Sequence, residues 1–204
     1  MTFFITGTDT EIGKTVASAW VMLHLKSKYW KPVQSGMDDE TDAEAIASIT
    51  ECASDAIFPS TYELQEPLSP HEAARRDGVT IELSAFSLPE TDGPLVVEGA
   101  GGLMVPLNDR EYMIDLIAHI GLPSILVCRS GLGTINHTLL SLEALRNRNL
   151  PVAGVIIVGP PEPHNRQAIE YYGKIPVLGE IPQLVSVNKE ALLEIEPEAA
   201  FSNL

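Results

Sequence analysis

Cysteines are scarce in this chain. Cys52 and Cys128 are its only two among 204 residues, and they stand far apart with alanine, valine and leucine nearby. We therefore expect two reduced, largely buried thiols rather than a disulfide or a metal-binding pair. The five histidines are also scattered, so the sequence offers no histidine metal centre and no Ser-His-Asp or Cys-His arrangement.

Basic residues and long apolar runs are lacking as well. The chain has 13 Lys and Arg against 28 Asp and Glu, a formal net charge of −15, and no run of five basic residues. A nucleic acid or an anionic membrane would require a basic patch, so neither is expected as a partner. No apolar run is long enough to span a bilayer, and Met1 leads directly into an apolar strand without a signal peptide. We expect a soluble cytoplasmic protein.

What is present is an alternation of apolar strands and amphipathic helices. No Ser/Gly-rich linker or repeat divides the chain, so residues 1–204 are interpreted as one domain. Strands are expected at residues 2–6, 29–33, 94–98, 124–128, 152–158 and 177–179. Helices are expected at residues 16–28, 41–50, 112–120, 136–148 and 165–172, with short helical pieces at 71–76 and 81–87. A proline-rich surface excursion is expected between residues 58 and 70. This order predicts an α/β fold with a mostly parallel sheet and helices on both faces.

A phosphate-binding loop is indicated between the first strand and the first helix. The segment GTDTEIGKT runs from Gly7 to Thr15, and five residues separate Gly7 from Gly13, one more than in the common Gly-x4-Gly-Lys-Ser/Thr pattern. The glycines let the backbone curl around phosphate oxygens, and the start of the helix adds positive potential. Lys14 supplies a charge and Thr15 a hydroxyl for Mg²⁺. The alternative is an ordinary turn and helix cap, but the context favours a P-loop fold that binds a nucleoside triphosphate.

Further polar residues follow the carboxyl ends of other strands, where ligands bind in open parallel sheets. Glu98 emerges from an apolar strand beside glycines, which suits a Mg²⁺ ligand or a water-holding acid; the alternative is a capping or ion-paired glutamate. Lys31 ends a short strand before a proline, which suggests a fixed cation near transferring charge, or else an exposed lysine. Ser35 is either a substrate donor or a turn residue. Asp42, by composition alone, is a solvated helix start.

A glycine loop precedes the helix expected at 136–148. Its backbone N–H groups could hold a carboxylate. The alternative is a plain glycine turn with Thr134 or Asn136 as the helix N-cap.

Six motifs together closely resemble the dethiobiotin synthetase family over nearly the whole chain. They are GTDTEIGKT at 7–15, KPVQSG at 31–36, EPLSPH at 66–71, VEGAGGLMVPL at 97–107, LGTINH at 132–137 and LGEIP at 178–182. The resemblance implies a cytoplasmic ligase of biotin biosynthesis with Mg²⁺ as cofactor. Its substrates would be 7,8-diaminopelargonate, CO₂ or bicarbonate, and ATP. One amine would form a carbamate, ATP would phosphorylate it to a carbamic-phosphoric anhydride, and the second amine would close the ring to give dethiobiotin, ADP and phosphate.

The resemblance also implies roles for individual residues. Lys31 and Lys14 would be catalytic, and Thr15, Asp42 and Glu98 would hold Mg²⁺ directly or through water. The nucleotide would contact Glu11, Ile12, Gly13, Lys14, Thr15, Val16, Asp42, Glu98, Gly99, Ala100, Gly101, Pro182, Gln183 and Leu184. The substrate would contact Thr10 and Ser35 at its amines. Its distal carboxylate would lie, across a homodimer interface, against the neighbouring subunit's Gly133, Thr134, Ile135 and Asn136.

One position departs from the family pattern. Family members often carry Asn-Asp after the strand at 152–158 and read adenine with it, whereas Val158 and Gly159 stand here. Two other classes of protein fit the sequence less well. A partitioning ATPase would have an extra lysine early in the phosphate loop and often a basic tail, while this chain has Thr8 to Glu11 and an acidic end. A cobalamin amidoligase would need a glutamine-hydrolysing domain, for which 204 residues leave no room.

Overall fold

A seven-stranded sheet forms the centre of the molecule. The computed structural model describes residues 1–38 and 40–204. The strand order is β4-β2-β6-β1-β7-β8-β9, and every neighbouring pair is parallel. The strands are β1 (Thr2–Gly7), β2 (Lys28–Trp30), β4 (Ile57–Phe58), β6 (Leu95–Gly102), β7 (Ser124–Arg129), β8 (Val152–Val158) and β9 (Val177–Ile181). From β1 the chain runs toward one edge of the sheet, through β2 and β4, and after β6 it runs toward the other edge, through β7, β8 and β9. Open α/β sheets bind ligands at the point where the direction of the strand order reverses.

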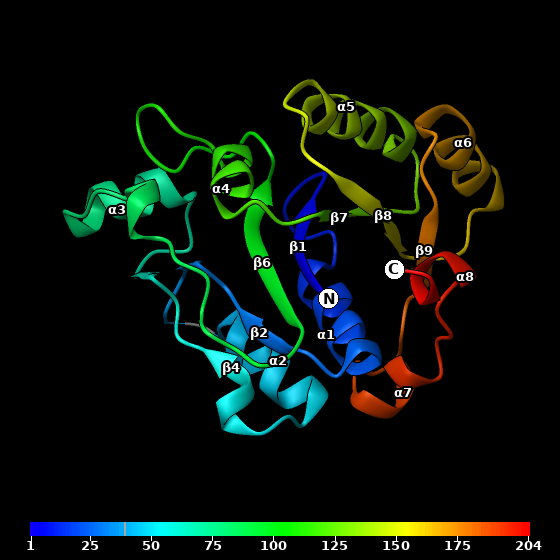
Figure 1. Ribbon diagram of the computed structural model, residues 1–204, viewed down its shortest axis with the longest axis horizontal. Helices are drawn as coiled ribbons and strands as arrows, with labels where there is room; N and C mark the ends of the chain where they lie inside the picture. Colours follow the sequence, from blue (N-terminus) through cyan, green and yellow to red (C-terminus); the bar gives the residue numbers. More distant parts are fainter. Residues whose placement is uncertain (39) are drawn as a thin grey trace.

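Helices cover both faces of this sheet (Figure 1). One layer contains α1 (Lys14–Leu25), α2 (Asp42–Thr50), α7 (Lys189–Leu193) and α8 (Ala199–Ser202), and the other contains α4 (Met113–Ile120), α5 (Thr134–Asn147) and α6 (Pro163–Gly173). A further helix, α3 (Pro70–Asp77), lies beside β3 (Val33–Ser35) and β5 (Tyr62–Leu64). The α/β prediction is therefore confirmed.

The central strand β1 shows why its sequence is apolar without alternation. Phe3 and Ile5 pack in the core on the α1 side, while Phe4 packs on the α4 side, and all three are buried. A strand covered on both faces needs apolar side chains at consecutive positions. Such a strand also fixes the position of the loop that follows it.

Residues 29–33 do not form the single strand that was expected. The strand β2 ends at Trp30, and β3 (Val33–Ser35) pairs with β5 (Tyr62–Leu64) in a separate two-stranded sheet. Pro32 stands at the break, where a residue without an N–H donor cannot continue the ladder. The helix expected at 81–87 is only a 3₁₀ turn at Leu83–Ala85, and β5 lies in the segment expected to be irregular.

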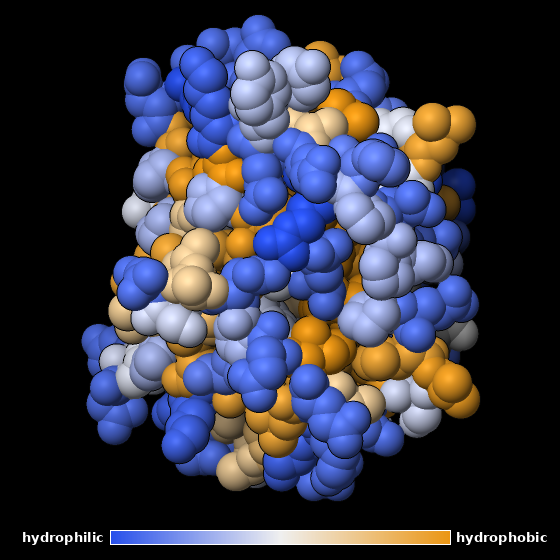
Figure 2. All heavy atoms as spheres, turned by 90° about the vertical axis from the view of Figure 1, so that its right-hand side faces the viewer, coloured by the Kyte–Doolittle hydropathy of each residue, from blue (hydrophilic) through white to orange (hydrophobic). Residues whose placement is uncertain are grey.

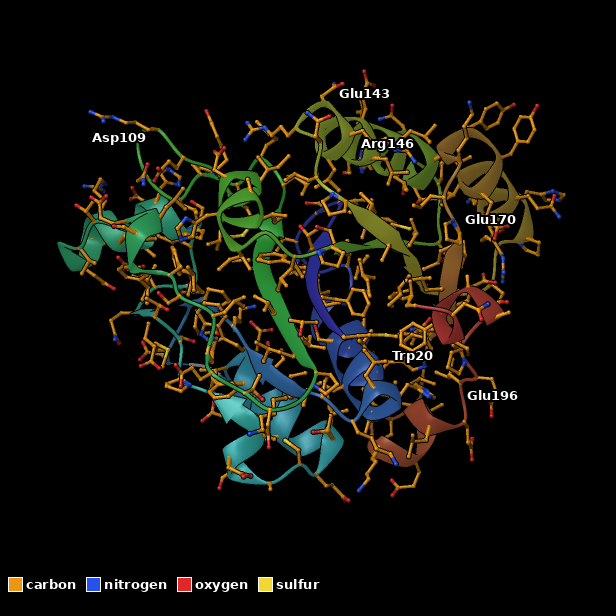
Figure 3. The ribbon with its side chains drawn as sticks, viewed as in Figure 1. Trp20, Asp109, Glu143, Arg146, Glu170 and Glu196 are labelled. Carbon is orange, nitrogen blue, oxygen red and sulfur yellow. The ribbon has the colours of Figure 1, made fainter. Side chains whose placement is uncertain are left out.

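The last residues of the described chain pack back onto α1. The Trp20 indole donates to the carbonyl oxygen of Ile195 at 2.9 Å, and its ring lies 5.0 Å from that of Phe201; Figure 3 shows Trp20 directed toward α8. Arg166 pairs with Glu180 and Glu198, which ties α6 to this segment. The face that includes α6 and α8 is mostly hydrophilic, with small hydrophobic groups between (Figure 2). Among the described residues, no helix combines the length and apolar character needed to cross a membrane.

Candidate active site

The phosphate-binding loop joins β1 to α1 and depends on Gly13. Gly13 is the N-cap of α1 with φ 86°, and a Cβ atom built there would lie 2.8 Å from Cγ1 of Val158 on β8. A larger residue would therefore meet both backbone strain and a clash. Lys14 begins the helix, and its Nζ donates to the carbonyl oxygen of Asp9 at 2.8 Å. Burial lowers the pKa of Lys14, although Glu98 opposes the shift.

A cleft of about 620 Å³ opens beside this loop. It gathers residues from four segments that are distant in the sequence. Most of the residues predicted for the nucleotide and for the reacting end of the substrate line it: Thr10, Glu11, Gly13, Lys14, Thr15, Val16, Lys31, Ser35, Asp42, Glu98, Ala100 and Gly101. The cleft also includes Gln34, Val105 and residues 67–70 of the EPLSPH motif. Three of the four segments expected to converge from the strand ends therefore meet in this cleft, while the glycine loop at 130–136 does not line it.

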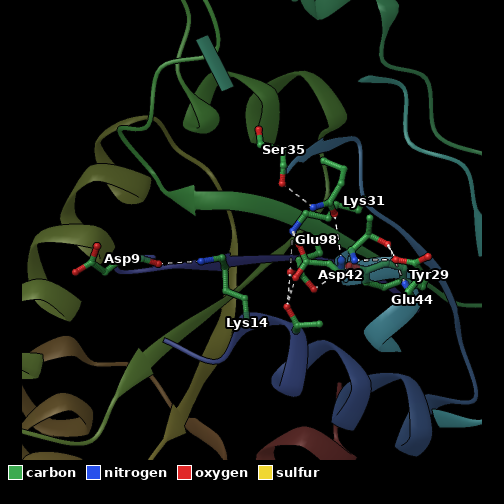
Figure 4. A network of polar contacts seen from close by, with 11 residues as sticks. Asp9, Lys14, Tyr29, Lys31, Ser35, Asp42, Glu44 and Glu98 are labelled. Carbon is green, nitrogen blue, oxygen red and sulfur yellow. Dashed lines mark hydrogen bonds and ion pairs between the residues drawn. The ribbon is translucent and has the colours of Figure 1, made fainter. Parts of the chain in front are cut away.

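Glu98 is the centre of a buried polar cluster (Figure 4). Its side chain is 1% exposed, and its Oε1 accepts from Lys31 Nζ at 3.1 Å and from the Thr15 hydroxyl at 3.2 Å. Lys31 also pairs with Asp42 Oδ2 at 2.5 Å, and Thr15 donates to Asp42 Oδ1. Lys31 is 5% exposed, so the alternative of a surface lysine is wrong. Asp42 is the first residue of α2, as its composition predicted, but its side chain is only 28% exposed because its carboxylate faces this cluster.

Electrostatics keep Lys31 and Asp42 charged. Burial alone would lower the pKa of Lys31, but the neighbouring carboxylates of Glu98 and Asp42 outweigh it and raise that pKa. Burial would raise the pKa of Asp42, but Lys31 and the Thr15 hydroxyl lower it overall. A buried cation between two carboxylates is therefore ionised at neutral pH, and it is available to interact with transferring phosphoryl charge.

The donor set is chemically suited to Mg²⁺. Thr15, Asp42 and Glu98 present hydroxyl and carboxylate oxygens to one another within the cleft. In residues 1–38 and 40–204, no three His, Cys, Asp or Glu side chains form a group that could hold a metal by themselves. Mg²⁺ commonly takes one or two carboxylates and completes its shell with substrate phosphates and water. These residues fit an ion that arrives with a nucleotide.

Three polar residues of the site were not predicted from the sequence. Tyr29 donates its hydroxyl to Glu98 Oε2 at 3.1 Å, and Gln34 Oε1 accepts from the Asp42 N–H at 3.2 Å. Arg129, at the end of β7, pairs with Asp9 at 2.8 Å. Tyr29 could have been found, because it stands two positions before Lys31 in the strand expected at residues 29–33, and alternation in such a strand would place the two on one face. The contacts of Gln34 with Asp42 and of Arg129 with Asp9 join distant residues, so no periodic pattern in the sequence predicts them.

Other predicted residues lie around the cleft rather than in it. Ile12 is buried, and Gly99 packs so tightly that an added Cβ would lie 2.8 Å from Phe4 Cε1. Pro182, Gln183 and Leu184 follow β9, whose Ile181 pairs with Val158 near the phosphate loop. The buried Ser35 hydroxyl has no hydrogen-bond partner within the described structure, although Ser35 itself lines the cleft.

The glycine loop after β7 also lies outside the cleft, at the start of α5. Gly133 is the N-cap with φ 91°, so the alternative that placed Thr134 or Asn136 there is wrong. Thr134 is instead buried, with its hydroxyl 3.5 Å from that of Thr138. Ile135 and Asn136 continue the first turn.

Several known proteins are similar to this chain over most of its length. A family model described as an AAA domain matches residues 1–191. The ATP-dependent dethiobiotin synthetase of Paramagnetospirillum magneticum is 51% identical over 194 residues, which cover 95% of this chain and 94% of that protein. The enzyme of the same name from Agrobacterium fabrum is 48% identical over 190 residues, covering 93% of this chain and 90% of that protein.

The solved structures add information on the fold alone. The cell division ATPase MinD of Pyrococcus furiosus superposes with a TM-score of 0.54 at 15% identity, over 95% of this chain and 88% of that one. This likeness shows that the two chains share a fold, whereas the sequence relationship to the dethiobiotin synthetases is much closer. The chain belongs to the family of ATP-dependent dethiobiotin synthetases.

Proposed function

We propose that this chain carboxylates 7,8-diaminopelargonate and closes its ureido ring, converting ATP to ADP and phosphate. The observation that carries the proposal is the buried cluster of Lys31, Glu98, Asp42 and Thr15 beside the phosphate loop. One amine nitrogen attacks CO₂ and loses a proton, which gives a carbamate. A carbamate oxygen then attacks the γ-phosphorus and ADP leaves. The second amine attacks the carbonyl carbon and loses a proton, phosphate leaves, and the ring closes.

Phosphoryl transfer requires positioning and cations more than a strong base. The N–H groups of residues 11–16 and the Lys14 ammonium would bind the triphosphate. Thr15, Asp42 and Glu98 would hold Mg²⁺, and the bound ion would neutralise part of the phosphate charge.

Lys31 would turn from its carboxylate partners toward the carbamate and the transferring group. Its position between Asp42 and Glu98 keeps it charged until then. Thr10 and the unpartnered Ser35 hydroxyl would contact the amine end of the substrate, where both line the cleft. Gly99, Ala100 and Gly101 would border the same space.

A homodimer would complete the site. The loop Gly133–Asn136 lies outside the cleft of its own subunit, so a carboxylate held by it would have to belong to a substrate in another subunit. A second cavity, of about 390 Å³, lies between α5 and the phosphate loop, and Met104 and Leu140 line it while remaining more than half exposed. Leu132 is fully exposed in the glycine loop. Such apolar exposure is typical of a surface that another chain covers.

The nucleotide base would lie near the ends of β8 and β9. Val158 and Gly159 stand there without a hydrogen-bonding side chain of their own, and Pro182, Gln183 and Leu184 follow β9. This favours weak discrimination among nucleoside triphosphates. The base would then be held mainly by apolar contact.

The test is mass detection of dethiobiotin from purified protein given 7,8-diaminopelargonate, bicarbonate and Mg²⁺, with ATP, CTP, GTP or UTP in separate reactions. Product with ATP supports the proposed reaction, and comparable product with other nucleotides supports weak base discrimination. Absence of product with all four, from folded protein, would overturn the proposal and favour a nucleotide-dependent switch.

A further inference from the structure

Tyr29 is a fully buried residue at the centre of the site that the proposed reaction does not use. It lies on β2 and pairs in register with Val96 of β6. In a parallel pair, residues directly opposite each other face the same side of the sheet, and so does the residue two positions further along. Tyr29 and Glu98 therefore project on the same side, where Tyr29 and Val96 both belong to the core beside α1.

The two oxygens of Glu98 have different partners. Oε1 accepts from Lys31 Nζ and from the Thr15 hydroxyl, which both line the cleft. Oε2 accepts from the Tyr29 hydroxyl at 3.1 Å, and Tyr29 does not line the cleft. One oxygen therefore faces the ligand space while the other is held from inside the protein (Figure 4).

This division matters once the ligands bind. In the proposed function, Lys31 turns to the carbamate and the Thr15 hydroxyl turns to Mg²⁺, so both present partners of Oε1 are withdrawn. Of the three hydrogen bonds to Glu98 described above, the one from Tyr29 remains. A buried carboxylate that loses its fixed contacts can rotate or take up another donor, and its oxygen is then no longer aimed at the ion.

We propose that Tyr29 is a positioning residue, whose hydroxyl fixes Glu98 Oε2 so that Oε1 faces the Mg²⁺-nucleotide. The inference rests on the proposed metal role of Glu98. Groups that orient metal ligands from behind commonly change metal affinity by about 10–100-fold when they are removed. The surrounding core holds the Tyr29 ring whether or not the hydroxyl is present, so the effect should be confined to the ion.

The experiment compares wild type with Tyr29→Phe, using Mn²⁺ as the probe because it accepts the same oxygen ligands and is visible by electron paramagnetic resonance. In the presence of saturating ADP, we expect Mn²⁺ to bind about 10-fold more weakly to the variant. ADP affinity measured with EDTA and without metal should change less than about 2-fold, since the phosphate loop is untouched. In turnover assays, the Mg²⁺ concentration for half-maximal rate should rise more than the saturated rate falls.

Two controls separate positioning from a general loss of stability. Tyr62→Phe removes a hydroxyl that accepts from the Glu82 N–H outside the site, and it should leave Mn²⁺ affinity unchanged. In a Glu98→Gln background, adding Tyr29→Phe should have little further effect on Mn²⁺ binding, because the tyrosine acts through that carboxylate.

A second pair of variants covers the case in which Tyr29→Phe does not fold. Replacement of Tyr29 by 4-methylphenylalanine keeps the volume and removes the donor, whereas 4-aminophenylalanine keeps a donor. Weak Mn²⁺ binding in the first and recovery in the second support the inference. Equal Mn²⁺ affinity for wild type and folded Tyr29→Phe would overturn it, while failure of wild type to bind Mn²⁺ with ADP would overturn the proposed metal site instead.

Discussion

Lys31 Nζ lies 3.1 Å from Glu98 Oε1, although 67 positions separate the two residues in the chain. Both are almost fully buried, and the pair is possible because β2 and β6 are neighbours with their carboxyl ends at the same edge. A buried charge pair of this kind contributes little net stability, but each partner strongly depends on the other. The pair therefore contributes little to holding the fold together, which accords with the proposed catalytic role of Lys31.

Replacing Lys31 by alanine should lower turnover by at least about 100-fold, because a fixed cation near transferring charge is lost. The phosphate loop is unchanged, so ATP should still bind, as measured by calorimetry. The melting temperature should fall, since Glu98 is left buried without its cation. Lys189→Ala, which removes an exposed pair with Glu51, is the matched control. Near-normal turnover in folded Lys31→Ala would remove Lys31 from the mechanism.

Replacing Glu98 by alanine should raise the Mg²⁺ concentration for half-maximal activity by at least about 10-fold, because an oxygen ligand is removed. The measurement is a Mg²⁺ titration at fixed total nucleotide. Glu196→Ala provides an exposed carboxylate for comparison and should match wild type. An unchanged Mg²⁺ titration in Glu98→Ala would discard the ligand assignment.

Gly13→Ala should abolish tight nucleotide binding. An alanine at φ 86° is strained by about 1–2 kcal/mol, and its Cβ would collide with Val158. The loop must shift, so its N–H groups no longer converge on phosphate. Gly93→Ala is the control, because a Cβ there meets nothing within 4 Å. Calorimetric titration with ADP compares the two, and equal affinity would contradict the proposed role of the loop geometry.

Because of Glu72, the stability of the folded chain should vary with pH in the acid range. Hydrogen bonds from Arg75 and Arg76 lower the pKa of Glu72 from 4.5 to about 2 in the folded chain. Its contribution to stability is therefore fully present above pH 4.5 and is lost as the pH falls toward 2. Wild type should melt at a higher temperature than Glu72→Gln at neutral pH, and the difference should shrink on acidification.

Salt provides the check on that interpretation. Glu72 and its two arginines lie on the surface of α3, so 1 M NaCl should reduce the same difference at neutral pH. A difference that persists at low pH and at high salt would mean that the substitution acts through packing.

Much of the site could be predicted from the sequence because one rule connects its parts. Parallel strands end at a common edge, so polar residues that follow apolar strands must meet there. This was sufficient to bring together Lys14, Lys31 and Glu98, which are distant in sequence. Glycine spacing also identified the phosphate loop, because the backbone conformation of such a loop depends on residues that are close together in the sequence.

The parts that were missed depend on contacts between distant residues or on very short elements. The break at Pro32 moves β3 into a second sheet, which only its pairing with β5 reveals. The helices α7 and α8 have five and four residues, too few to show a period. Tyr29 was missed because its ring is an ordinary core side chain, and only its hydroxyl contacts Glu98.

The central position of β1 has a consequence for how the chain is made. This strand is translated before both of its neighbours, β6 and β7, which lie far downstream and end at Gly102 and Arg129. The nascent segment that carries the phosphate loop therefore waits, unpaired, until most of the chain has been translated. Nucleotide binding would then occur late in biosynthesis, because the phosphate loop is held in place only after β6 and β7 have paired with β1.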